Sequence, residues 1–87
     1  MKTKIVGTDT VKLTNQNYTA GVITVSGDLG GGSAKLVFSN GDGDFIDVPD
    51  GDVVVGDVVE LTHGLGNIPY IVVTGATELV VNYHGVK

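Results

Sequence analysis

Seven of the ten carboxylate side chains lie between Asp42 and Glu60, so this segment is the first candidate for a metal-binding or catalytic site. Residues 40–44 read Asn-Gly-Asp-Gly-Asp, with oxygen ligands at positions 1, 3 and 5 of a calcium-type loop. The pattern then fails, because Phe45 stands where the loop needs glycine and Gly51 where it needs a bidentate glutamate. Asn-Gly and Asp-Gly also mark hairpin turns, so we interpret this run as a turn, with calcium binding as the alternative.

A glycine-rich segment resembles a phosphate-binding loop over part of its length. Residues 27–35 read Gly-Asp-Leu-Gly-Gly-Gly-Ser-Ala-Lys, but Gly32 is followed by Ser33 and Ala34, where such a loop needs Lys and then Ser or Thr. We also expect no helix after the segment, and the phosphate would need a helix N-terminus. We therefore interpret residues 27–33 as a flexible turn.

His63 and His84 are the only histidines of the chain. Either could serve as a base or a metal ligand, but the spacing does not bring them together with each other or with an acid. Ser26, Ser33 and Ser39 lie in no nucleophile-elbow pattern. We therefore expect a protein that is not an enzyme and that needs no cofactor and no metal.

Three further residues are candidates for an interface. Successive side chains of a β-strand point to opposite faces, and this alternation in residues 45–48 places Phe45 on the outward face. An outward Phe is either an interface anchor or a sign that the strand register is wrong by one residue. The run Tyr-Ile-Val-Val at 70–73 is apolar on both faces, which is typical of a strand covered on both sides or buried in an oligomer. The candidate interface residues are Phe45, Tyr70 and Val72.

These residues must be positioned by β-strands. The chain contains 16 Val, 5 Ile and 9 Thr, and its 14 glycines interrupt any helix of useful length. We predict an all-β fold, a small antiparallel β-sandwich or barrel of seven to eight strands with no helix. The predicted strands are residues 3–6, 11–14, 18–25, 34–39, 45–48, 58–62, 70–74 and 78–84, with a short addition at 53–55. The predicted turns are residues 15–17, 27–33, 40–43, 49–51, 64–67 and 75–77.

The same alternation predicts the core. In residues 78–84, Leu79, Val81 and Tyr83 form a dry face opposite a mostly polar one. The predicted core residues are Leu36, Phe38, Ile46, Val59, Leu61, Ile71, Val73, Leu79 and Val81.

Length and charge limit the function. The chain has 87 residues and no cysteine, so residues 1–87 form a single β domain that no disulfide stabilises, and we expect it to form a homo-oligomer. The net charge is −5 with no arginine, which argues against nucleic acid as a partner. No apolar run is long enough for a membrane span or a signal peptide, so we expect no membrane partner and assembly in the cytoplasm.

Residues 45–51 (Phe-Ile-Asp-Val-Pro-Asp-Gly) and 71–81 (Ile-Val-Val-Thr-Gly-Ala-Thr-Glu-Leu-Val-Val) resemble small virion proteins of tailed bacteriophages. The resemblance covers the second half of the chain, and no functional residue carries over. It implies a capsid decoration (cement) protein, a homotrimer in the virion whose partner is the major capsid protein or another virion protein. A neck or tail structural component is the alternative within this class. A small calcium- or carbohydrate-binding β module is the alternative outside it.

Overall fold

The computed structural model describes residues 2–14, 18–40, 44–62 and 67–86, and in these ranges it contains six β-strands and no helix. The strands are β1 (Lys2–Lys12), β2 (Ala20–Asp28), β3 (Ser33–Ser39), β4 (Phe45–Val53), β5 (Val58–Thr62) and β6 (Ile68–Val86). The predicted all-β fold is confirmed. In the described ranges there is consequently no helix of the length and apolarity that crossing a membrane requires.

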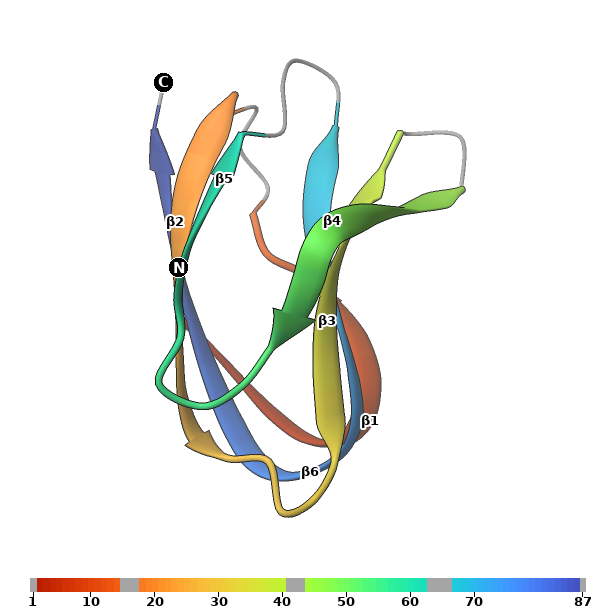
Figure 1. Cartoon of the computed structure of the whole chain (residues 1–87), viewed down its shortest axis with the longest axis vertical. Helices are drawn as coiled ribbons and strands as arrows, with labels where there is room; N and C mark the ends of the chain where they lie inside the picture. The colour runs from red at the N-terminus through yellow and green to blue at the C-terminus, as the bar shows by residue number, and fades with distance from the viewer. Residues whose placement is uncertain (1, 15–17, 41–43, 63–66, 87) are drawn as a thin grey trace.

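All strand pairings are antiparallel, and β6 is the central strand. The strand order is β4-β3-β6-β2-β5, and β1 also pairs with β6. The first half of β6 pairs with β3 and the second half with β2, whereas β1 follows both halves. The sheet therefore curls into two arms, a first arm of β4-β3-β6-β1 and a second arm of β5-β2-β6-β1. Figure 1 shows the two arms rising from a shared lower end, where β1 and β6 bend from one arm into the other.

The bends in β1 and β6 depend on two glycines. Gly7 has a φ of 82° and Gly75 a φ of 68°, a left-handed conformation that glycine adopts without steric cost. Gly7 pairs with Ala76, and the register shifts on both sides of Gly7. The Thr8 hydroxyl accepts a 3.1 Å hydrogen bond from the Gly75 N–H, which ties the two bends together.

The predicted turn at 75–77 is therefore wrong, because it is a bulged bend inside one continuous strand. This correction also changes the strand count from the predicted seven or eight to six. Residues 3–6 and the first half of the predicted strand 11–14 belong to β1, which ends at Lys12, and residues 70–74 and 78–84 both belong to β6.

The predicted turn at 49–51 is also wrong, because these residues lie within β4. Asp50 has a φ of 54°, and the pairing of β4 with β3 shifts register between Lys35 and Val37. Pro49 has no N–H to donate, and β4 is an edge strand, where this causes no loss of pairing. The Pro-Asp-Gly sequence thus forms a bulge in an edge strand instead of a reversal of the chain.

Most of the predicted core is confirmed. Leu36, Leu61, Ile71, Val73, Leu79 and Val81 are buried, and Phe38 and Val59 pack against the core partly buried. The predicted dry face of 78–84 is confirmed as well, since Tyr83 is buried with Leu79 and Val81. The core also contains residues that sequence reasoning missed: Ile5, Leu13, Ile23, Val25, Ala34, Val53 and Ala76.

Ile46 is the one predicted core residue that is wrong, because 52% of it is exposed. It pairs with Phe38, so it lies on the inward face as alternation predicts. However, this end of the β3–β4 hairpin projects away from the second arm (Figure 1), so the inward face has no cover there.

Two paired glycines in the second arm leave room for tyrosine rings. Gly21 of β2 and Gly85 of β6 are cross-strand partners. A Cβ atom on Gly21 would overlap the ring of Tyr83, and one on Gly85 would overlap the ring of Tyr18. The two ring centroids are 6.2 Å apart. The rings therefore fill the space over both glycines at this end of the arm.

Candidate interaction surface

The outward face of the first arm combines apolar and charged side chains. The register pairs Val37 with both Asp47 and Tyr70, and Ser39 with Phe45. Because side chains alternate between faces and partners share a face, the outward set follows from this register. We call it the outer face of the first arm, and it includes Lys12, Lys35, Val37, Ser39, Phe45, Asp47, Ile68, Tyr70 and Val72.

An aromatic pair lies on this outer face. The ring centroids of Phe45 and Tyr70 are 5.2 Å apart at an interplanar angle of 79°, an edge-to-face contact. Phe45 is 52% exposed and Tyr70 is half-buried. Val37, the register partner of Tyr70, is buried although it points away from the core, so its neighbours on the outer face cover it. Tyr70 of the aromatic pair therefore lies beside a closely packed side chain.

The structure brings together the three residues that sequence reasoning selected. Phe45 and Tyr70 are in contact, and Val72 lies two residues beyond Tyr70 on the same face of β6, where it pairs with Lys35. Phe45 faces outward with Asp47, as alternation predicted, so the alternative of a register error by one residue is wrong. The use of Phe45 as an interface anchor stays a prediction.

Charged groups surround the aromatic pair. Lys35 Nζ lies 3.4 Å from Asp47 Oδ1, with 47% and 78% of the two side chains exposed. Such exposed ion pairs contribute little to stability, so both groups are available to a partner. On the other side, Lys12 of β1 pairs with Tyr70. The surface thus has an apolar centre and a charged rim, the usual anatomy of a protein interface.

A hollow of about 230 Å³ lies beside the bulge in β4, lined by Lys35, Leu36, Asp47, Val48, Asp50, Gly51 and Asp52. Three carboxylates border it, but in the described ranges no three or more His, Asp or Glu side chains form a group able to hold a metal ion. The central residues of the predicted calcium-type run, 41–43, lie outside the described residues.

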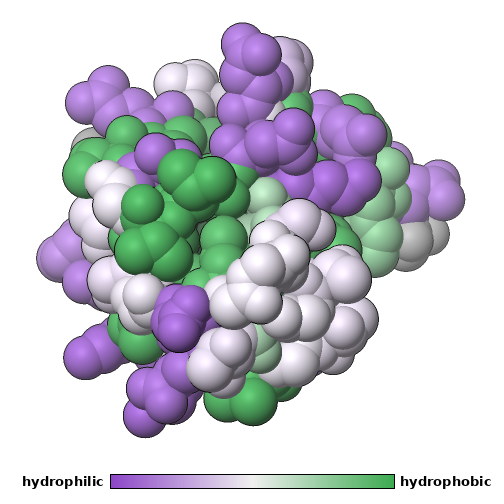
Figure 2. All heavy atoms as spheres, turned by 60° about the horizontal axis from the view of Figure 1, so that its bottom comes forward, coloured by the Kyte–Doolittle hydropathy of each residue, from purple (hydrophilic) through white to green (hydrophobic). Residues whose placement is uncertain are grey.

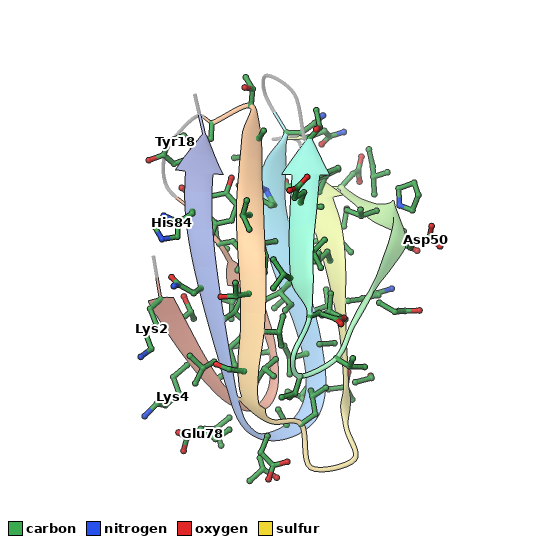
Figure 3. The ribbon with its side chains drawn as sticks, turned by 60° about the vertical axis from the view of Figure 1, so that its left-hand side comes forward. Lys2, Lys4, Tyr18, Asp50, Glu78 and His84 are labelled. Carbon is green, nitrogen blue, oxygen red and sulfur yellow. The ribbon has the colours of Figure 1, made fainter. Side chains whose placement is uncertain are left out.

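The other residues with a chemical interpretation are separate from this surface. His84 lies on the outward face of the second arm, exposed and paired in register with Val22 (Figure 3). His63 lies outside the described residues. The predicted turn in 27–33 is confirmed, since Asp28 Oδ1 accepts a 2.8 Å hydrogen bond from the Gly30 N–H. No helix follows this turn, because β3 begins at Ser33.

The outward face of the second arm is more polar than the outer face of the first arm. Lys4 Nζ lies 3.5 Å from Glu78 Oε1, with both side chains more than half exposed. Thr24 and Asn82 are register partners in the middle of this face. No Phe or Tyr ring is found among the described residues that alternation places there, so this face lacks the apolar aromatic pair of the first arm.

A second apolar surface was missed by sequence reasoning. Val54 and Val55 lie in the connection between β4 and β5 and Val58 begins β5; they are 58%, 43% and 68% exposed. This connection lies at the end of the molecule that Figure 2 brings forward, where green apolar residues reach the surface. Asp57 Oδ2 accepts a 2.9 Å hydrogen bond from the Val54 N–H, so the turn is well defined. Residues 54 and 55, predicted to add to a strand, belong to this turn instead.

Comparisons of the chain with family models, with curated proteins and with solved structures find no match.

Proposed function

We propose that this chain is a structural virion protein that decorates and stabilises a phage capsid, binding the shell surface as a trimer. The resemblance of residues 45–51 and 71–81 to small phage virion proteins supports this class. The observation that carries the proposal is the exposed Phe45–Tyr70 pair on the outer face of the first arm. Capsid shell protein is the partner that this face would bind.

The outer face of the first arm has the composition that a docking surface needs. Aromatic rings at the centre of an interface contribute much of the binding free energy when a polar rim excludes water. Tyr70 lies beside its buried register partner Val37 and Phe45 contacts the Tyr70 ring, so both rings are already packed against neighbours and should lose less entropy on binding. Lys12 and Asp47 in the rim give the face charges of both signs.

The acidic character of the chain fits a position on a shell. With a net charge of −5 the protein is repelled by the packaged genome and attracted to basic patches of other virion proteins. A neck or tail component would need the same kind of surface, so copy number separates these two roles.

The first test is quantitative mass spectrometry of purified virions of the phage that encodes the chain. A decoration protein occurs in proportion to the major capsid protein, whereas a neck or tail component occurs in only a few copies per particle. Absence of the chain from purified particles would contradict the proposal.

The second test uses Phe45→Asp with Ile46→Asp as a matched control. Both residues are 52% exposed on the same strand, but they face opposite sides. Phe45→Asp should weaken binding to shells assembled without the chain by about thirtyfold or more, the size of a hot-spot effect. Ile46→Asp should leave binding unchanged. Equal effects of the two substitutions would exclude the outer face as the docking surface.

A further inference from the structure

Among the described strands, β1 lies outside the main path of the sheet. The order β4-β3-β6-β2-β5 is continuous without β1, which joins this path through its pairing with β6. Loss of the β1 pairing would therefore leave five strands still paired with one another. Such an element can open while the rest of the sheet stays folded, because local opening breaks only the contacts of the element itself.

Gly7 divides β1 into two halves. The pairing of β1 with β6 shifts register on both sides of Gly7, which has a left-handed φ of 82°. Residues 2–5 pair with residues 79–82 in the second arm. Residues 9–12 pair with residues 70–73 in the first arm. The two halves of β1 are therefore separate ladders on the same neighbouring strand.

The half of β1 that runs along the second arm is held by few side chains. We call residues 2–6 the strap. Ile5 is the one buried side chain of the strap, and Val6 beside it is 68% exposed. Lys4 Nζ lies 3.5 Å from Glu78 Oε1, but both side chains are more than half exposed, and such an ion pair contributes little to stability. The backbone ladder and one buried side chain thus hold the strap in place.

The other half of β1 is anchored more firmly. Leu13, directly after the strand, is buried, and its N–H donates a 3.0 Å hydrogen bond to the Pro69 carbonyl. Val11 is partly buried against the core. At the bend, the Thr8 hydroxyl accepts the hydrogen bond from the Gly75 N–H. Opening of the strap should therefore end at the bend, where these anchors begin.

We propose that the strap opens and closes over β6 as a unit while the rest of the sheet stays folded. Gly7 is the hinge, because glycine changes its backbone angles at the lowest steric cost. When the strap opens, residues 79–82 of β6 remain paired with β2 on one side. Their other side, which the closed strap covers, becomes a free strand edge. The outer face of the first arm takes no part, so the strap is independent of the proposed capsid binding.

The experiment is hydrogen exchange of the full chain, followed by NMR at each backbone amide in several low concentrations of urea. Exchange through opening of the strap should depend weakly on urea, because this opening exposes little surface. We expect this weak dependence for the strap amides that donate to β6, with exchange at least about tenfold faster than for the slowest amides of β2 and β6. The amides of residues 9–12, on the same strand and against the same neighbour, are the matched comparison and should be better protected.

Two substitutions separate opening of the strap from global unfolding. Ile5→Ala removes the buried side chain of the strap and should accelerate exchange of the strap amides by about thirtyfold or more. Ile71→Ala weakens the core that stays folded when the strap opens. It should accelerate exchange of the slowest amides by a similar factor and leave the strap amides within about threefold of the wild type. Ile71→Val makes the same comparison with a smaller loss if Ile71→Ala is unfolded.

Strap amides that match the slowest amides in both protection and urea dependence would overturn the proposal. An equal acceleration of the strap amides and the slowest amides by Ile71→Ala or Ile71→Val would also overturn it, because the strap would then open only when the whole protein unfolds. Neither result bears on capsid binding, which the Phe45 and Ile46 variants test separately.

Discussion

The ring of Tyr83 lies over Gly21, in the space that a side chain on Gly21 would occupy. We therefore expect Gly21→Ala to destabilise the protein by about 1–3 kcal/mol, the usual cost of overpacking. In a domain of this size, such a loss lowers the melting temperature by several degrees or more. Thr24→Ala, at an exposed position of the same strand, is the control and should change the free energy of unfolding by less than about 0.5 kcal/mol. A Gly21→Ala melting temperature equal to that of wild type would show that the ring moves aside freely.

Burial should delay the ionisation of Tyr83. Desolvation by burial and then the nearby Tyr18 raise the pKa of Tyr83 above its ordinary value of 10.0. Above pH 10 the unfolded chain loses this proton while the folded chain keeps it, so stability falls as pH rises. Stability that depends on this group is complete below pH 10 and is lost as the pH passes the folded pKa.

The measurement is chemical denaturation at several alkaline pH values. Tyr83→Phe should flatten the decline above pH 10, whereas Tyr70→Phe, at a half-buried position of the first arm, should retain it. An unchanged decline in Tyr83→Phe would assign the alkaline instability to another group.

Phe45→Ala and Ile71→Ala should differ in their effects on stability. Ile71 is fully buried, so its truncation leaves a cavity and should cost about 2–5 kcal/mol. Phe45 is half exposed and should lose about 1 kcal/mol, mainly from its contact with the Tyr70 ring. Urea denaturation of both variants measures the difference. If the two losses were similar, Phe45 would be a core residue and the outer face would not be a docking surface.

Asp57 should stabilise the turn between β4 and β5 through its side chain. Asp57→Ala removes the acceptor for the Val54 N–H, and we expect a loss of about 1 kcal/mol. Asp57→Asn keeps a carbonyl oxygen in a similar place and should lose less. Thermal melts compare the two variants, and an equal loss in both would mean that the carboxylate charge matters more than the hydrogen bond.

Much of the fold could be predicted because alternation is a local signal. It placed Leu79, Val81 and Tyr83 on one buried face and Phe45 on the outward face. Alternation does not show whether another part of the protein covers an inward face. Ile46 lies on an uncovered part of the inward face and is therefore exposed. Whether a residue of the first arm is covered depends on the position of the second arm, which no local sequence pattern predicts.

The positions of the glycines predict the fold less specifically than alternation does. A glycine with positive φ serves equally well in a chain reversal or in a bend within a strand. Gly75 is therefore compatible with the predicted turn and with the observed bend, and only the pairing of Gly7 with Ala76 separates them. On the candidate surface, Phe45 contacts Tyr70 only because β3 pairs in a particular register with both β4 and β6. No local pattern in the sequence determines that register.

The central position of β6 also determines the order in which this protein can fold during synthesis. β1 pairs only with β6 among the described strands, so the first strand made by the ribosome waits until residues 68–86 have emerged. Before then only the β2–β5 and β3–β4 pairs can form. Such a high contact order predicts slow folding. The unfinished chain therefore exposes its edge strands to other nascent copies, a stage at which chaperones would reduce aggregation.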